Sequence, residues 1–117
     1  MCVVRGADRP VITRGPGLPT LQRLVDRTCG SAALTVLVNV FTSGEAVPEH
    51  THQVEEVLLV RAGECTVTVA GQPQAARAGD AVIVPPGTRH GIQHRPPERC
   101  EVVAVLASPD ANTATSS

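Results

Sequence analysis

Aromatic residues and lysine are almost absent from this chain of 117 residues. There is no Trp and no Tyr, and Phe41 is the single aromatic residue; we expect it in the core. Without aromatic rings a site cannot stack bases or flavins, which argues against nucleic-acid recognition. All ten basic residues are Arg. Lysine Schiff-base chemistry is therefore excluded.

Charge and cysteine usage narrow the class of protein further. The formal net charge of -1 gives no reason to expect nucleic acid or a membrane surface as partner. No stretch approaches the roughly 20 apolar residues of a membrane span, and charge and Pro interrupt the N-terminal residues, so no secretion signal is indicated. The cysteines (Cys2, Cys29, Cys65 and Cys100) form no C-x-x-C pair. We predict a cytoplasmic protein with reduced thiols, with a structural disulfide as the alternative. Cys65 and Cys100 are expected to be small core residues.

Short β-branched segments recur at intervals of about ten residues, separated by Gly and Pro. No long segment has the 3.6-residue apolar period of a helix. The pattern predicts one domain and an antiparallel all-β sandwich or barrel. The small polar residues 108–117 are expected to form a disordered tail. Strands are expected over residues 2–4, 18–27, 33–42, 54–62, 65–70, 74–78, 81–84, 90–94 and 101–107, with a turn at 71–73.

Histidine and glutamate occur with the spacing of metal ligands. The four histidines lie in two groups, His50 with His52 and His90 with His94, and Glu56 follows the first group. Side chains alternate along an extended segment, so His50 and His52 share a face, and Glu56 joins them if the strand continues. A single histidine is more often a surface or hydrogen-bonded residue than a ligand, so the joint pattern carries the prediction. Imidazole and carboxylate together suit one divalent transition metal (Fe, Mn, Ni, Cu, Co or Zn) better than Ca or Mg.

Two segments around these residues resemble the two sequence motifs of the cupin superfamily. The first is GEAVPEHTHQVEEVLLVRAG, residues 44–63, and the second is GDAVIVPPGTRH, residues 79–90. The short segment between them is similar to that of the most compact bacterial cupins. The resemblance implies a small single-domain cupin over residues 1–107, with its barrel core at about 31–107. It also implies a double-stranded β-helix, or jelly-roll barrel, whose mouth holds His50, His52, Glu56 and His90 as metal ligands.

The second motif departs from the cupin pattern at its end, where His94 stands in place of the usual Asn. His94 has the parity of His90 and is expected to face into the barrel. Two roles stay open for it: a hydrogen-bonding group of the pocket wall, and a general acid or base beside the metal. Pro85 is expected to fix the turn that presents His90. Arg89 is expected to be solvated, or to rim the mouth and attract an anion.

The resemblance also implies an open metal site. Four protein ligands on a six-coordinate metal leave two positions for substrate, O2 or water. One carboxylate on a divalent ion leaves a charge of about +1, which favours anionic oxygen ligands. We therefore expect an enzyme of bacterial (secondary) metabolism that acts on a small anionic oxygenated substrate by dioxygenase-like oxidation, isomerisation or cyclisation. The alternatives are a non-catalytic ligand-binding or sensor cupin and a metal-free, epimerase-like cupin. A homodimer is expected, because it would cover exposed strand edges.

Overall fold

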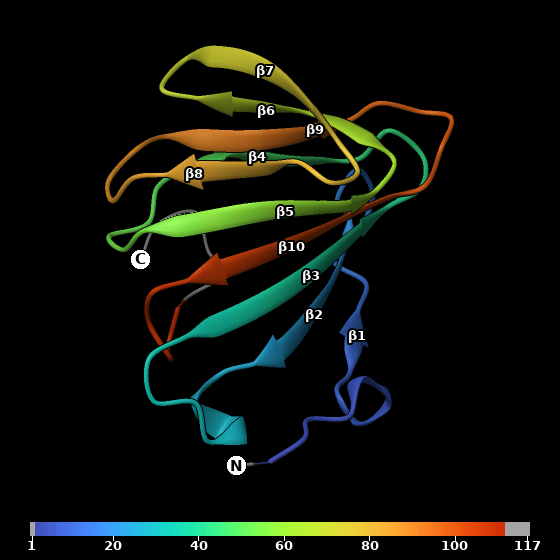
Figure 1. The fold of residues 1–117 in the computed structure, drawn as a ribbon. Helices are drawn as coiled ribbons and strands as arrows, with labels where there is room; N and C mark the ends of the chain where they lie inside the picture. Colours follow the sequence, from blue (N-terminus) through green and yellow to red (C-terminus); the bar gives the residue numbers. More distant parts are fainter. Residues whose placement is uncertain (1, 112–117) are drawn as a thin grey trace.

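Two antiparallel sheets face each other in the computed structural model, which describes residues 2–111 (Figure 1). Within these residues, no helix has the length and apolarity needed to cross a bilayer. The predicted all-β architecture of two packed sheets is confirmed. The six-stranded sheet has the order β1 (Val11–Ile12), β2 (Thr20–Val25), β3 (Thr35–Phe41), β10 (Cys100–Leu106), β5 (Glu56–Ala62) and β8 (Ala81–Val84). The four-stranded sheet has the order β4 (Ala46–His50), β9 (His90–His94), β6 (Glu64–Val69) and β7 (Gln72–Arg77), and two short 3-10 helices cover Gly6–Asp8 and Arg27–Cys29.

Proline explains two of the differences between the predicted and observed strands. Pro48 lies inside β4, which the sequence did not predict as a strand, and Pro73 lies inside β7, where a turn was expected. Both strands are edges of the four-stranded sheet, where a residue without an N–H group is tolerated. The turn before β7 is shorter than expected, because Ala70 and Gly71 both take positive φ angles, of 52° and 79°. Such a two-residue turn matches the twist of a hairpin.

The N-terminal prediction was also wrong, because residues 2–4 form no strand. The first strand is the two-residue β1, which pairs with β2 at Val11 and Ile12. A two-residue strand is too short to give a period-2 pattern that could be detected in the sequence.

Apolar side chains from both sheets fill the space between them. Phe41 is fully buried, as predicted, and it belongs to the same core cluster as Leu58 and Val67, which come from opposite sheets and are 1% and 0% exposed. Cys65 and Cys100 are both fully buried and free, which confirms their expected role as core residues. Burial raises the pKa of the Cys65 thiol to about 12, and the neighbouring Cys100 adds to this shift. Both thiols are therefore protonated and unreactive at neutral pH.

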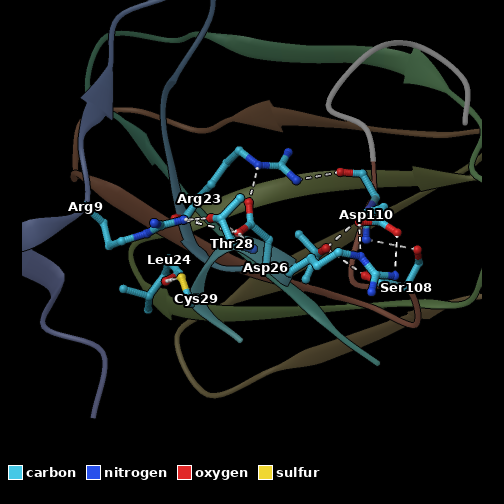
Figure 2. A network of polar contacts seen from close by, with 11 residues as sticks. Arg9, Arg23, Leu24, Asp26, Thr28, Cys29, Ser108 and Asp110 are labelled. Atoms are coloured by element: carbon cyan, nitrogen blue, oxygen red, sulfur yellow. Dashed lines mark hydrogen bonds and ion pairs between the residues drawn. The ribbon is translucent and has the colours of Figure 1, made fainter. Parts of the chain in front are cut away.

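Asp26 organises a polar network at the end of β2 (Figure 2). Its carboxylate accepts hydrogen bonds from the backbone N–H of Thr28 at 2.9 Å, from the Thr28 hydroxyl, and from Arg23 Nε at 3.0 Å. Arg9 adds an ion pair at 3.4 Å. The Thr28 hydroxyl bond, with Arg23, lowers the pKa of Asp26 to about 2 against the opposing effect of burial. The network stabilises the turn between β2 and β3.

The segment after β10, where the disordered tail was expected to begin, contacts this network and the start of β3. The Thr35 hydroxyl donates to the Ser108 carbonyl at 2.6 Å and accepts from the Ala111 N–H at 3.3 Å. Arg23 Nη2 donates to the Ala111 carbonyl at 2.8 Å, and Ala111 is only 4% exposed. These contacts satisfy the carbonyl of Ser108 and both backbone groups of Ala111. Residues 112–117, the rest of the expected tail, lie outside the described part of the chain.

Candidate metal centre

Four predicted ligands meet at one place, and they come from both sheets. His50 is the last residue of β4 and His90 the first residue of β9, whereas Glu56 is the first residue of β5. His52 lies in the loop between β4 and β5. One nitrogen or carboxylate oxygen from each residue lies within 4.8 Å of the others. We call these four residues the His–Glu cluster.

The route by which Glu56 reaches the cluster differs from the one that strand parity suggested. The strand does not continue from His50 to Glu56, because residues 51–55 leave the four-stranded sheet and cross to the six-stranded sheet. Glu56 therefore approaches the imidazoles from the opposite sheet. Its side chain is still directed inward, with an exposure of 4%. The predicted ligands of the two sheets therefore meet at the mouth of the barrel.

A close approach of β4 to β9 places His50 opposite His90. The two histidines are register partners, and the pairing is irregular between Val47 and His50. Gly91 stands beside this irregularity. A Cβ atom on Gly91 would lie 2.9 Å from the Val47 carbonyl oxygen, closer than real Cβ contacts. Only glycine fits there, because the strand backbone occupies the space of a side chain.

The turn before β9 links the two sequence motifs directly. Pro85 accepts a hydrogen bond from the Thr88 N–H at 3.2 Å, which closes the expected turn just before His90. Within this turn the Gly87 N–H donates to the carbonyl of His52 at 2.7 Å. Gly87 has a φ of 74°, a conformation that favours glycine. This hydrogen bond connects the backbone of the second motif to the backbone of the first.

Backbone carbonyls select the imidazole tautomers of two cluster residues. His50 Nδ1 lies 2.8 Å from the Pro48 carbonyl oxygen, and His90 Nδ1 lies 2.9 Å from that of Thr88. A carbonyl oxygen only accepts, so both Nδ1 atoms carry the proton and donate it. In the neutral ring of each residue, Nε2 is then unprotonated and its lone pair is available at the cluster. This arrangement orients histidines for metal binding.

Polar atoms of the cluster face one another at short range. His52 Nε2–H donates to His50 Nε2 at 3.1 Å, because the Nδ1 atom of His50 already carries the proton of that ring. His90 Nε2 lies 2.6 Å from Glu56 Oε1, and neither atom has a further hydrogen-bond partner among the described residues. Buried acceptors without donors are costly unless a proton or cation lies between them. The donor set of three imidazoles and one carboxylate therefore fits a divalent transition metal.

The pKa values of the cluster histidines favour neutral ligands at two positions. Burial lowers the pKa of His50 and of His52, so both imidazoles stay uncharged at neutral pH. Burial also opposes a charge on His90, but the Glu56 carboxylate and the Thr88 carbonyl outweigh it and raise its pKa. A proton therefore competes with a metal most effectively at His90.

The cluster opens onto a hollow of about 460 Å³, its open mouth included. Apolar side chains from both sheets form most of the wall, together with Asn39 and Arg14. The sequence did not single out Arg14, because it lies in a Gly- and Pro-rich segment with no ligand-like spacing. Arg89, the cation that the sequence offered for the rim, is exposed, forms a 3.6 Å ion pair with Glu49 and is not among the lining residues.

His94 faces inward, as predicted, but at the other end of β9 from His90. It is 2% exposed and does not line the hollow. Its Nδ1 accepts from the Gly44 N–H at 2.9 Å, and its Nε2 donates to the Glu98 carbonyl at 2.6 Å. These bonds fit the role of a hydrogen-bonding group in the barrel wall. The alternative role of an acid or base beside the metal lacks a free ring nitrogen in this arrangement.

Comparisons with known proteins agree with this fold. The cupin-domain family model matches residues 37–106. A comparison with curated protein sequences finds no match. The polyketide cyclase RemF from Streptomyces resistomycificus superposes with a TM-score of 0.77 at 24% identity, over 92% of this chain and 79% of that chain. An RmlC-like cupin from Shewanella frigidimarina gives a TM-score of 0.76 at 28% identity, over 92% and 90%. KdgF from Halomonas sp. gives 0.78 at 20% identity, over 94% and 96%. These likenesses confirm the predicted double-stranded β-helix.

Proposed function

This chain belongs to the cupin family, and we propose that it is a metal-dependent enzyme that converts a small anionic oxygenated molecule at the His–Glu cluster. The observation that carries the proposal is the convergence of four ligand atoms within 4.8 Å, with two imidazoles already held in the ligating tautomer. The four residues line the hollow, so a metal that they hold would be accessible to a substrate there. A bound transition metal supplies Lewis-acid or redox chemistry at a substrate oxygen.

The composition of the hollow narrows the reaction class. Apart from the His–Glu cluster, the described residues that line it include no Asp, Glu, His, Cys, Lys or Tyr. A reaction that needs a separate protein acid and base is therefore disfavoured. Dioxygenase-like oxidation, isomerisation and cyclisation fit better, since a metal held by the cluster would supply the Lewis-acid or redox chemistry that these reactions need. The apolar wall would orient the substrate and keep water away from it.

Similar solved structures suggest which substrates to test first. One similar structure is a polyketide cyclase, so phenolic and enolic substrates of bacterial secondary metabolism are the first candidates. Such substrates carry the anionic oxygen atoms that a site of net positive charge favours. The predicted cytoplasmic location and homodimeric state belong to the same proposal.

The test is turnover of phenolic and enolic carboxylates by protein loaded in turn with Fe(II), Mn, Co, Ni, Cu and Zn, with and without O2. Substrate-dependent O2 uptake supports a dioxygenase, and conversion without O2 supports isomerisation or cyclisation. The variant His50→Ala should lose turnover, whereas Glu55→Gln, an exposed neighbour of the cluster, should retain it. Tight binding of a compound that every metal form returns unchanged would instead identify a sensor and refute the enzyme.

A further inference from the structure

Arg14 is a partly buried cation without an acidic partner. It lies in the segment before β2, and its side chain lines the same hollow as the His–Glu cluster. No ion pair among the described residues involves Arg14, in contrast to Arg89. Burial lowers its pKa, and no carboxylate counteracts this effect. A desolvated guanidinium without a counter-ion is costly, so its presence calls for an anion.

The hydrogen bonds of Arg14 leave most of its donors unused. Nη2 reaches the Pro19 carbonyl and Asn39 Oδ1, both at 3.4 Å. These distances exceed the usual 2.9–3.0 Å of an N–H···O bond, so both bonds are weak. Nε is buried and has no partner among the described residues. The planar guanidinium can therefore offer two parallel N–H groups to a carboxylate, at little cost in existing bonds.

Asn39 is the second polar group of the wall. It stands on the inner face of β3 between Leu37 and Phe41, and it is 7% exposed. The other wall residues are apolar: Leu21, Leu37, Val47, Leu58, Ile92 and Ala104. Among the described residues that line the hollow, polar side chains thus lie at two places, the His–Glu cluster and the Arg14–Asn39 pair. A ligand with an apolar body and an anionic group at each place would satisfy both.

We infer that Arg14 determines substrate specificity by binding a carboxylate of the substrate while another oxygen of the same molecule faces the His–Glu cluster. The inference rests on the proposed function. It adds that the substrates are small carboxylates with an aliphatic or compact body. With a divalent ion at the cluster, the charge of the hollow is about +2, counting one carboxylate and one guanidinium. Two anionic groups on the substrate neutralise it.

The inference is tested by NMR titration of the protein with butyrate and with its neutral isostere butyramide. Both metal-free and zinc-loaded protein are used, and zinc content is measured separately. Wild-type protein should prefer butyrate. Arg14→Gln should weaken butyrate binding about 10- to 100-fold, the usual range for a charged hydrogen bond, and leave butyramide binding unchanged. The affinity of Arg14→Lys for butyrate should lie between that of wild type and that of Arg14→Gln, because lysine keeps the charge but lacks the planar guanidinium.

Arg89→Gln is the matched control, since it removes an exposed arginine outside the hollow and should bind butyrate as wild type does. The inference is overturned if Arg14→Gln binds butyrate as tightly as wild type, if it loses both probes equally, or if wild type shows no preference for butyrate. The metal-free titration separates this inference from the proposed function. Protein that takes up no zinc refutes the metal enzyme, whereas a butyrate-specific loss in metal-free Arg14→Gln still supports the anion site.

Discussion

Removing the carboxylate of the His–Glu cluster should abolish most of the stabilisation that a metal provides. Glu56 is the single anionic ligand, and its Oε1 lies 2.6 Å from His90 Nε2. In Glu56→Gln the amide N–H can donate to that nitrogen, so the metal-free variant should fold about as stably as wild type. The metal-bound variant loses the attraction between a carboxylate and a divalent cation. Metal affinity should then fall by about 100-fold or more, since even residues behind the ligands contribute 10- to 100-fold.

The loss of metal affinity can be measured as a smaller stabilisation of the folded protein by the metal. A ligand present at about 1,000 times its Kd stabilises the fold by about 4.1 kcal/mol, and at about 10 times its Kd by about 1.4 kcal/mol. A 100-fold weaker affinity therefore removes about 2.7 kcal/mol. For a domain of this size each kcal/mol corresponds to about 4–6 °C in Tm, so the zinc-induced rise should shrink by about 10–16 °C.

The assay is thermal unfolding of metal-free protein with and without zinc, at one fixed zinc concentration. Glu55→Gln is the control, because Glu55 is exposed and adjacent in sequence but lies outside the cluster. It should show the wild-type rise. The zinc-induced rise should also decrease at acidic pH, because protons compete for His90, whose pKa is raised. An equal rise in Glu56→Gln and wild type would refute the assignment of Glu56 as a ligand.

Three further predictions concern the rest of the fold. In native protein a thiol reagent should modify exposed Cys2 and spare Cys65 and Cys100 until denaturant is added; rapid labelling of the buried pair would contradict the packing. Asp26→Asn should cost about 2 kcal/mol at pH 7, measured by denaturant unfolding. Because the folded pKa of about 2 lies below the unfolded value of 3.8, the wild-type advantage should disappear as the pH falls from about 4 to 2, and an advantage that persists there would oppose this account. The outer face of the six-stranded sheet exposes 65% of Ile83, so Ile83→Arg should weaken the expected homodimer in light scattering, and a monomeric wild type would end that expectation.

Local patterns were sufficient to predict much of this protein. Alternating β-branched segments placed β2, β3, β5, β6, β8, β9 and β10 near their observed bounds, because side-chain alternation and Gly or Pro breaks are properties of short segments. The same holds for the ligand set, since His50, His52 and Glu56 lie within seven residues of one another. The resemblance to cupin motifs supplied His90 and the barrel.

Edge strands were harder to recognise. Proline concealed β4 and the first residues of β7 in the sequence, because an edge can be identified only once the order of strands in the sheet is known. The docking of residues 108–111 depends likewise on Thr35 and Arg23, which are more than 70 residues away in the chain.

The sequence by itself determined the all-β class, the spacing of His50, His52 and Glu56 and the inward direction of His94, and its resemblance to the cupin motifs added His90 to the ligands. Tertiary structure alone decided that Glu56 enters from the opposite sheet, that backbone groups of Gly44 and Glu98 occupy both nitrogens of His94, and that Arg14 and not Arg89 reaches the hollow. The physical reason is the separation along the chain of the residues that interact. Spacing along a strand encodes which face a side chain takes, but its partners across the barrel depend on register and loop paths, which only the packed sheets define.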